Sequence, residues 1–82
     1  MKKDITKVLH EAAKIRIGKK GLTEAIIVEV EKLLKKDGAI KIKCLKTIPK
    51  ESIPFIAKNI ADLTESQVVD IRGKTFVLYK SR

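Results

Sequence analysis

Two glycines bracket two lysines in the segment Gly18-Lys19-Lys20-Gly21, and this spacing is suited to contact with a phosphate group. Glycine lets the backbone turn sharply and approach a ligand without a Cβ atom in the way. An amphipathic pattern follows directly, so the loop is expected at the start of a helix, where free N–H groups and the helix dipole attract anions. The loop matches neither the P-loop pattern nor the dinucleotide-binding glycine pattern. The sequence therefore predicts a loop that follows a nucleic-acid backbone rather than one that encloses a free nucleotide.

Residues that could support catalysis or bind a metal are scarce. His10 is the only histidine and Cys44 the only cysteine, so they cannot complete a zinc site. His10 is expected at the surface or edge of a short helix, and Cys44 alternates with Ile40 and Ile42 as a small buried residue does. We therefore expect no catalytic centre, no metal site and no cofactor.

Positive charge is concentrated in parts of the chain. The net charge is +9 on 82 residues, which attracts polyanions. Residues 1–20 carry +5, residues 41–50 and 72–82 carry +4 each, residues 21–40 carry −1 and residues 51–71 carry −3. This segregation predicts basic surfaces set apart from acidic helix faces, with phosphate as their counterpart. An ordinary solvated lysine-rich surface is the alternative.

Further candidates for phosphate contact lie near the glycine loop in sequence or at the last turn of the chain. Arg16 is favoured because a guanidinium can bind phosphate oxygens with two parallel hydrogen bonds. Lys41 and Lys43 point together from one face of a strand, and the sequence leaves open whether they join the loop's surface. The other candidates are Lys2, Lys3, Lys7, Lys14, Arg72 and Lys74.

Length and composition predict one soluble domain spanning residues 1–82. The longest apolar run, AIIV, is far shorter than the roughly 20 residues of a membrane-spanning helix. No secretory signal is visible, and one cysteine without a partner fits a reducing compartment. We expect a cytoplasmic protein that does not contact membranes.

Hydrophobic spacing predicts the elements that position these residues. A first helix is expected from Asp4, a short strand at Lys14–Ile17, and a second helix after Gly21 that ends at Gly38. A strand follows at Ala39–Lys46, and a third helix starts near Ser52. Its core-facing side is expected to include the residues Ile53, Ile56, Ala57, Ile60 and Leu63.

Two strands at residues 66–71 and 74–80 are expected to form the final hairpin across Arg72 and Gly73. The order αβαβαββ predicts an α/β protein of the two-layer α+β type, in which helical crossovers join parallel strands and the hairpin adds an antiparallel one.

The three aromatic residues, Phe55, Phe76 and Tyr79, all lie in apolar patterns and are expected to pack in the core. Base stacking of the kind used by many single-strand binders needs exposed rings. We therefore predict recognition through backbone charge and nucleic-acid shape.

The segments IGKKGLTEAIIVEVEKLLKKDGAIKIK, at 17–43, and VVDIRGKTFVLYK, at 68–80, resemble the CRM domain (chloroplast RNA splicing and ribosome maturation) in its stand-alone YhbY-type form. The resemblance implies an RNA-binding domain similar to the C-terminal domain of translation initiation factor three. Its four-stranded mixed sheet would have the strand order one, two, four, three. It also implies that Gly18, Lys19, Lys20 and Gly21 form a loop like the one with which KH domains clamp a nucleic-acid backbone.

This resemblance predicts structured RNA as the ligand, ribosomal or pre-ribosomal in origin, with ribosomal proteins as further partners. Assembly of the large ribosomal subunit or RNA maturation would be its setting. The chain departs from the family in the shortened basic stretch EAAKIRIG before the first strand, and in Lys80, which replaces the usual arginine. A basic DNA-coating protein and a ribosome-associated protein-interaction module are the two alternatives.

Overall fold

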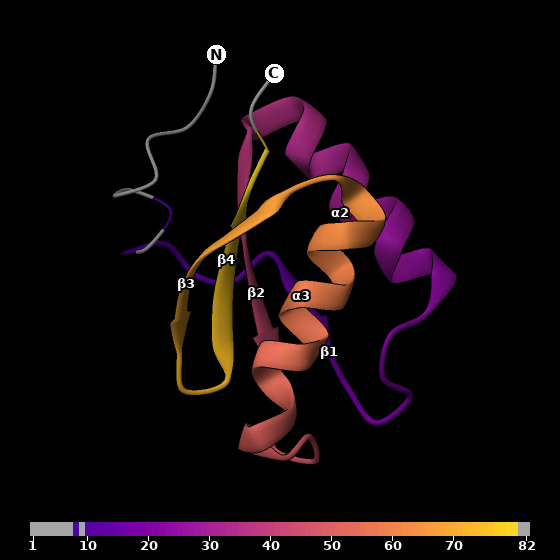
Figure 1. Cartoon of the computed structure of the whole chain (residues 1–82), viewed down its shortest axis with the longest axis vertical. Helices are drawn as coiled ribbons and strands as arrows, with labels where there is room; N and C mark the ends of the chain where they lie inside the picture. Colours follow the sequence, from indigo (N-terminus) through magenta and orange to yellow (C-terminus); the bar gives the residue numbers. More distant parts are fainter. Residues whose placement is uncertain (1–7, 9, 81–82) are drawn as a thin grey trace.

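The computed structural model describes residue 8 and residues 10–80, and in this part of the chain two helices lie on one face of a four-stranded sheet (Figure 1). The elements follow in the order β1 (Ile15–Ile17), α2 (Glu24–Asp37), β2 (Ala39–Cys44), α3 (Ile53–Thr64), β3 (Gln67–Arg72) and β4 (Thr75–Tyr79). A 3-10 turn at Lys50–Ser52 precedes α3. The helix expected from Asp4 lies outside the described residues, apart from residues 8 and 10, and so do Lys2, Lys3 and Lys7.

The strand order is β1-β2-β4-β3, as predicted. Strands β1 and β2 are parallel, and β4 runs antiparallel to both β2 and β3. Because β4 runs opposite to β2, the turn that precedes β4 lies at the same end of the sheet as the segments that follow β1 and β2. Figure 1 shows these three connections together at its lower end.

One face of the sheet forms the core with the two helices. Ile40, Ile42 and Cys44 are buried on this face of β2, and Phe76 and Leu78 accompany them from β4. Val30 and Leu34 are the buried residues of α2 and belong to the same cluster, in agreement with the amphipathic pattern that follows the glycine loop in the sequence.

The opposite face of the sheet is partly covered by the chain before β1. Val8 packs with Ala39 and Val77 in a second, smaller apolar cluster. The Lys41 ammonium donates a 3.0 Å hydrogen bond to the backbone oxygen of Glu11. Lys41 is therefore committed to the structure of its own chain, whereas Lys43, two residues further along the same strand, is exposed.

The predicted core contacts of α3 are wrong at two residues. Phe55 is 74% exposed and Leu63 is 55% exposed, while Ala61 and Thr64 are buried. At 100° per residue, Phe55 lies on the outer side of a helix whose inner side is set by Ile53 and its successors. Thr64 tolerates burial because its hydroxyl donates to the Ile60 backbone oxygen at 2.8 Å.

Candidate functional site

The glycine loop forms a tight turn. The Gly21 N–H donates a 2.8 Å hydrogen bond to the Gly18 oxygen, and Lys19 and Lys20 stand exposed at the tip. The conformation and packing of the chain itself favour glycine at both positions. Gly21 has a φ of +71°, and a Cβ atom on Gly18 would lie 3.1 Å from Cδ1 of Leu45, which is tighter than ordinary van der Waals contact.

Replacing Gly21 with alanine is expected to lower the free energy of unfolding by about 1 kcal/mol, because a Cβ atom is disfavoured at positive φ. No atom lies within 4 Å of the added Cβ, so the cost arises in the backbone alone. Urea unfolding measures the difference. Gly21→Asn is the matched control and should cost less, since asparagine tolerates this conformation. Equal losses in the two variants would contradict a backbone origin.

The helix behind the loop starts later than its predicted position. Helix α2 begins at Glu24, and Thr23 is its N-cap residue. The Thr23 hydroxyl accepts the N–H of Ile26 at 3.3 Å, so one of the N–H groups expected to face a phosphate is already satisfied. The carboxylate of Glu24 stands in the first turn, where it competes with an incoming anion. Cationic side chains are therefore the principal anion-binding feature near the loop.

Four lysines meet at the end of the sheet where the three connections converge. They surround an open hollow of about 520 Å³, to which each connection contributes. Lys19 comes from the glycine loop, Lys43 and Lys46 from β2 and the segment after it, and Lys74 from the β3–β4 turn. This site is called the lysine hollow below, and its lining residues are Lys19, Lys43, Cys44, Leu45, Lys46, Thr47 and Lys74.

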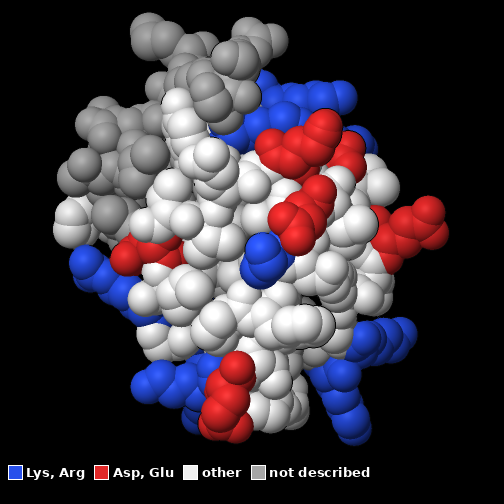
Figure 2. Space-filling model, viewed as in Figure 1, with Lys and Arg blue, Asp and Glu red and all other residues white. Residues whose placement is uncertain are grey.

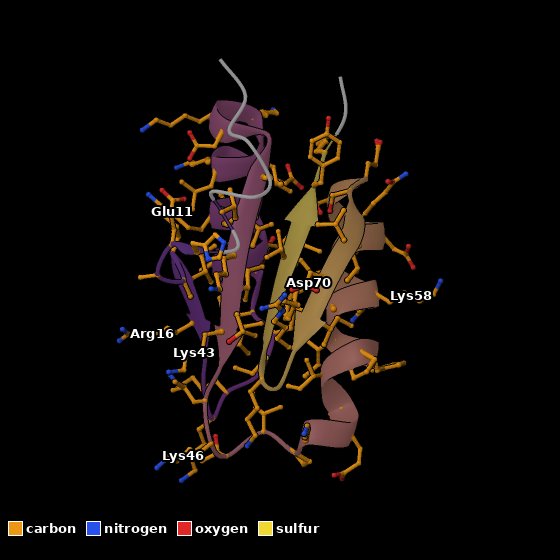
Figure 3. All side chains as sticks on the ribbon, turned by 90° about the vertical axis from the view of Figure 1, so that its left-hand side faces the viewer. Glu11, Arg16, Lys43, Lys46, Lys58 and Asp70 are labelled. Atoms are coloured by element: carbon orange, nitrogen blue, oxygen red, sulfur yellow. The ribbon has the colours of Figure 1, made fainter. Side chains whose placement is uncertain are left out.

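Backbone pairing and one side-chain hydrogen bond position these lysines. Lys43 is the register partner of Arg16 in the parallel pair β1–β2, so their side chains leave the same face of the sheet. The Lys74 ammonium donates a 2.8 Å hydrogen bond to the Lys46 backbone oxygen, which ties the hairpin to the segment after β2. In Figure 3, Arg16, Lys43 and Lys46 lie on one side of the molecule, and Lys58 of α3 points away on the other.

The predicted phosphate-binding residues are only partly brought together. Lys19 and Lys74 line the lysine hollow. Arg16 lies beside it, because Arg16 is the register partner of Lys43, which also lines the hollow. Gly18, Lys20 and Gly21 belong to the adjoining turn.

Two further predicted residues lie outside the lysine hollow. Lys14 is exposed next to Lys41, whose backbone oxygen accepts the Lys14 N–H at 3.0 Å. Arg72 forms a surface ion pair with Asp70, with 3.3 Å between Nε and Oδ2, yet its side chain stays 78% exposed. Such a pair contributes little energy, so Arg72 remains able to exchange Asp70 for a phosphate.

Lys46 and Leu45 were missed by the sequence interpretation. The signal for Lys46 was present in the charge of +4 over residues 41–50, which contain no acidic residue. Its position beside Lys19 and Lys74 depends on how β1 and β4 flank β2. Leu45 carried no such signal, because an isolated leucine at the end of a strand is normally read as core.

Cys44 and His10 are the remaining groups with chemical potential, and of these only Cys44 lines the lysine hollow. Cys44 is buried, and that burial raises the pKa of its thiol while the nearby Lys74 ammonium opposes the shift. His10 is exposed, as predicted. Over residues 8 and 10–80, no group of three or more His, Cys, Asp or Glu side chains is placed to hold a metal ion. Within the same residues, neither helix is long and apolar enough to cross a bilayer.

The surface on the helix side carries both acidic and basic side chains. Figure 2 looks onto the helices, where acidic side chains lie mostly over the middle and upper part of a largely uncharged surface and one lies at the lower end. Lys and Arg side chains project mainly from its margins, including the lower end where the three connections lie. Acidic and basic side chains also lie next to each other in this view, so the separation of basic and acidic surfaces stays a prediction.

A two-layer domain with the strand order β1-β2-β4-β3 is the arrangement that the sequence resemblance predicts. The CRS1/YhbY (CRM) domain family model matches residues 2–80, and the chain belongs to this family. The solution structure of the protein SAV1595 from Staphylococcus aureus, itself proposed to bind RNA, is similar with a TM-score of 0.80 and 22% sequence identity. The match covers 95% of this chain and 80% of that one, and it confirms the fold.

Proposed function

We propose that this protein binds structured RNA through the lysine hollow and the adjoining Gly18–Gly21 turn. The observation that carries this proposal is the convergence of four lysines, one from β2 and three from separate connections, with no acidic residue among the lining side chains. Phosphates are the natural counter-charge, because neutralising them releases condensed cations into solution. Membership of the CRM family supports RNA binding, and it supports a binding role rather than an enzymatic one.

At a finer level, the proposed ligand is ribosomal RNA. Pre-ribosomal or ribosomal RNA, bound in the cytoplasm during large-subunit assembly or RNA maturation, is the ligand that fits the family resemblance, with ribosomal proteins as neighbours. The same proposal includes a fold similar to that of the C-terminal domain of translation initiation factor three. RNA recovered after cross-linking in cells tests the assignment directly: enrichment of ribosomal sequences supports it, and their absence contradicts it.

Salt dependence separates phosphate contact from other modes of binding. If the site neutralises about four to six phosphates, log affinity should fall with log salt with a slope of roughly −3 to −5. Fluorescence anisotropy with a labelled structured RNA measures this slope. Competition by duplex DNA of equal length, at two salt concentrations, tests the DNA-coating alternative. An affinity insensitive to salt, or equal competition by DNA, would contradict the proposal.

A protein-interaction module remains the second candidate function because α3 exposes Phe55 and Leu63. Large exposed apolar side chains can mark a protein contact. Under this alternative the positive charge only guides docking, and the helix layer meets a protein partner. A double variant with Lys19 and Lys20 replaced by alanine discriminates the two functions: unchanged RNA affinity with a retained fold would favour the interaction module.

A further inference from the structure

We infer that the lysine hollow holds one unpaired nucleotide of the bound RNA, with its base against Leu45 and its flanking phosphates on the surrounding lysines. This inference rests on the proposed function and makes it more specific. It replaces the expectation of recognition by charge and shape alone with a preference for RNA that contains an extruded nucleotide.

Leu45 gives the hollow an apolar wall in a firmly held position. Leu45 is 40% exposed, although Lys46 follows it in sequence and three further lysines line the same hollow. Its N–H donates to the Ile17 oxygen at 2.9 Å, and its own oxygen accepts the Ile48 N–H at 3.0 Å. The close approach of Leu45 to Gly18 further fixes the side chain against the glycine turn. An exposed apolar side chain held this way is suited to cover the face of a base.

The size of the hollow argues for a nucleotide rather than a phosphate alone. Its volume of about 520 Å³ lies within the range of sites for small organic ligands. A phosphate would leave most of this space, and the Leu45 wall, in contact with water. A base within a paired helix cannot enter, because its faces are covered by its stacked neighbours. An extruded base has free faces and costs less to unstack than a paired one.

The lysines are placed to hold the strand on either side of such a base. Lys46 and Lys74 are joined by the hydrogen bond from the Lys74 ammonium, whose remaining donors can reach a phosphate. Lys19 approaches from the glycine turn, and Lys43 from β2 beside Arg16. Cations on separate connections can thus contact phosphates of successive nucleotides while the base lies between them. No aromatic ring lines the hollow, so little preference among the four bases is expected.

Three RNA duplexes of one sequence test this inference by fluorescence anisotropy at one salt concentration. The first is fully paired, the second carries one additional unpaired uridine, and the third carries an abasic residue at that position. The unpaired uridine should raise affinity about tenfold over the paired duplex. The abasic duplex should lose this gain although it keeps the bulged backbone. Equal affinity for all three overturns the inference and leaves the proposed function intact, whereas binding to none of them overturns both.

Variants of Leu45 assign the preference to the hollow. Leu45→Ala should abolish the preference for the unpaired uridine, measured as the ratio of its affinity to that of the paired duplex in the same variant. Leu45→Met keeps the bulk of the side chain and should keep the preference. This variant is the control for a change in the fold of the segment. Val28→Ala is the matched control, because Val28 is 48% exposed on α2 and lies outside the hollow. A preference that survives in Leu45→Ala overturns the inference.

Discussion

Replacing Lys19, Lys43 and Lys46 together with alanine is expected to weaken binding to structured RNA roughly 100-fold at moderate salt and to lower the salt slope by about 2 to 3. Each lysine lines the hollow, and each would lose about one phosphate contact. Lys74 is left in place because its ammonium also supports the backbone of residue 46. Fluorescence anisotropy across a series of salt concentrations measures both quantities.

A control triple variant removes the same charge elsewhere. Lys35, Lys36 and Lys58 are exposed, and α2 ends at the opposite end of the molecule from the three connections (Figure 1). Replacing these three lysines with alanine lowers the net charge equally, so any general electrostatic attraction falls by a similar amount. We expect a loss of affinity of less than about tenfold for this variant. Equal losses in both triple variants would mean that net charge, and not the lysine hollow, determines binding.

Much of the fold could be predicted because local patterns agree with the final packing. The alternation of Ile40, Ile42 and Cys44 with lysines identified β2 and its buried face, and Gly38 ended α2 in the left-handed conformation expected of a helix C-cap. Pro54 stands in the first turn of α3, where it is tolerated. Each of these signals depends on residues within a few positions of one another, so one sequence was enough to interpret them.

The candidate site was harder to predict because it is assembled from distant parts of the chain. Lys19 and Lys74 were proposed separately, and only the flanking of β2 by β1 and β4 brings both to Lys46. The start of α2 was misplaced because Leu22 continues the apolar pattern, whereas the side-chain hydrogen bond of Thr23 sets the helix boundary. Sequence patterns report which residues share an element, but they do not report which loops share a surface.

Phe55 and Phe76 show the same limit for the core, because both were expected to be buried. Phe76 is fully buried on the central strand β4, whereas Phe55 projects from the outer side of α3. In a stretch with many apolar residues, more than one side of the element could face the core. The sequence pattern then fits a buried and an exposed apolar residue equally well. The two residues therefore form a matched pair for measuring what burial contributes to this fold.

Phe76→Ala is expected to lower the free energy of unfolding by about 3 to 5 kcal/mol, because it removes a buried ring and leaves a cavity between the sheet and both helices. Domains of this kind have a total stability of about 5 to 15 kcal/mol, so much of the variant could unfold at moderate temperature. Urea unfolding followed by circular dichroism measures the loss. Phe76→Leu restores most of the volume and should recover the larger part of it.

Phe55→Ala makes the same chemical change at a side chain that is 74% exposed, so its effect should stay within about 0.5 kcal/mol. A loss comparable to that of Phe76→Ala would show that Phe55 is covered when the protein is in solution, which would contradict the exposed outer side of α3. If Phe55→Ala instead leaves stability unchanged but weakens capture of a ribosomal protein, the exposed ring serves a protein contact. Because α3 and the lysine hollow lie on different parts of the fold, RNA affinity should remain unchanged in this variant.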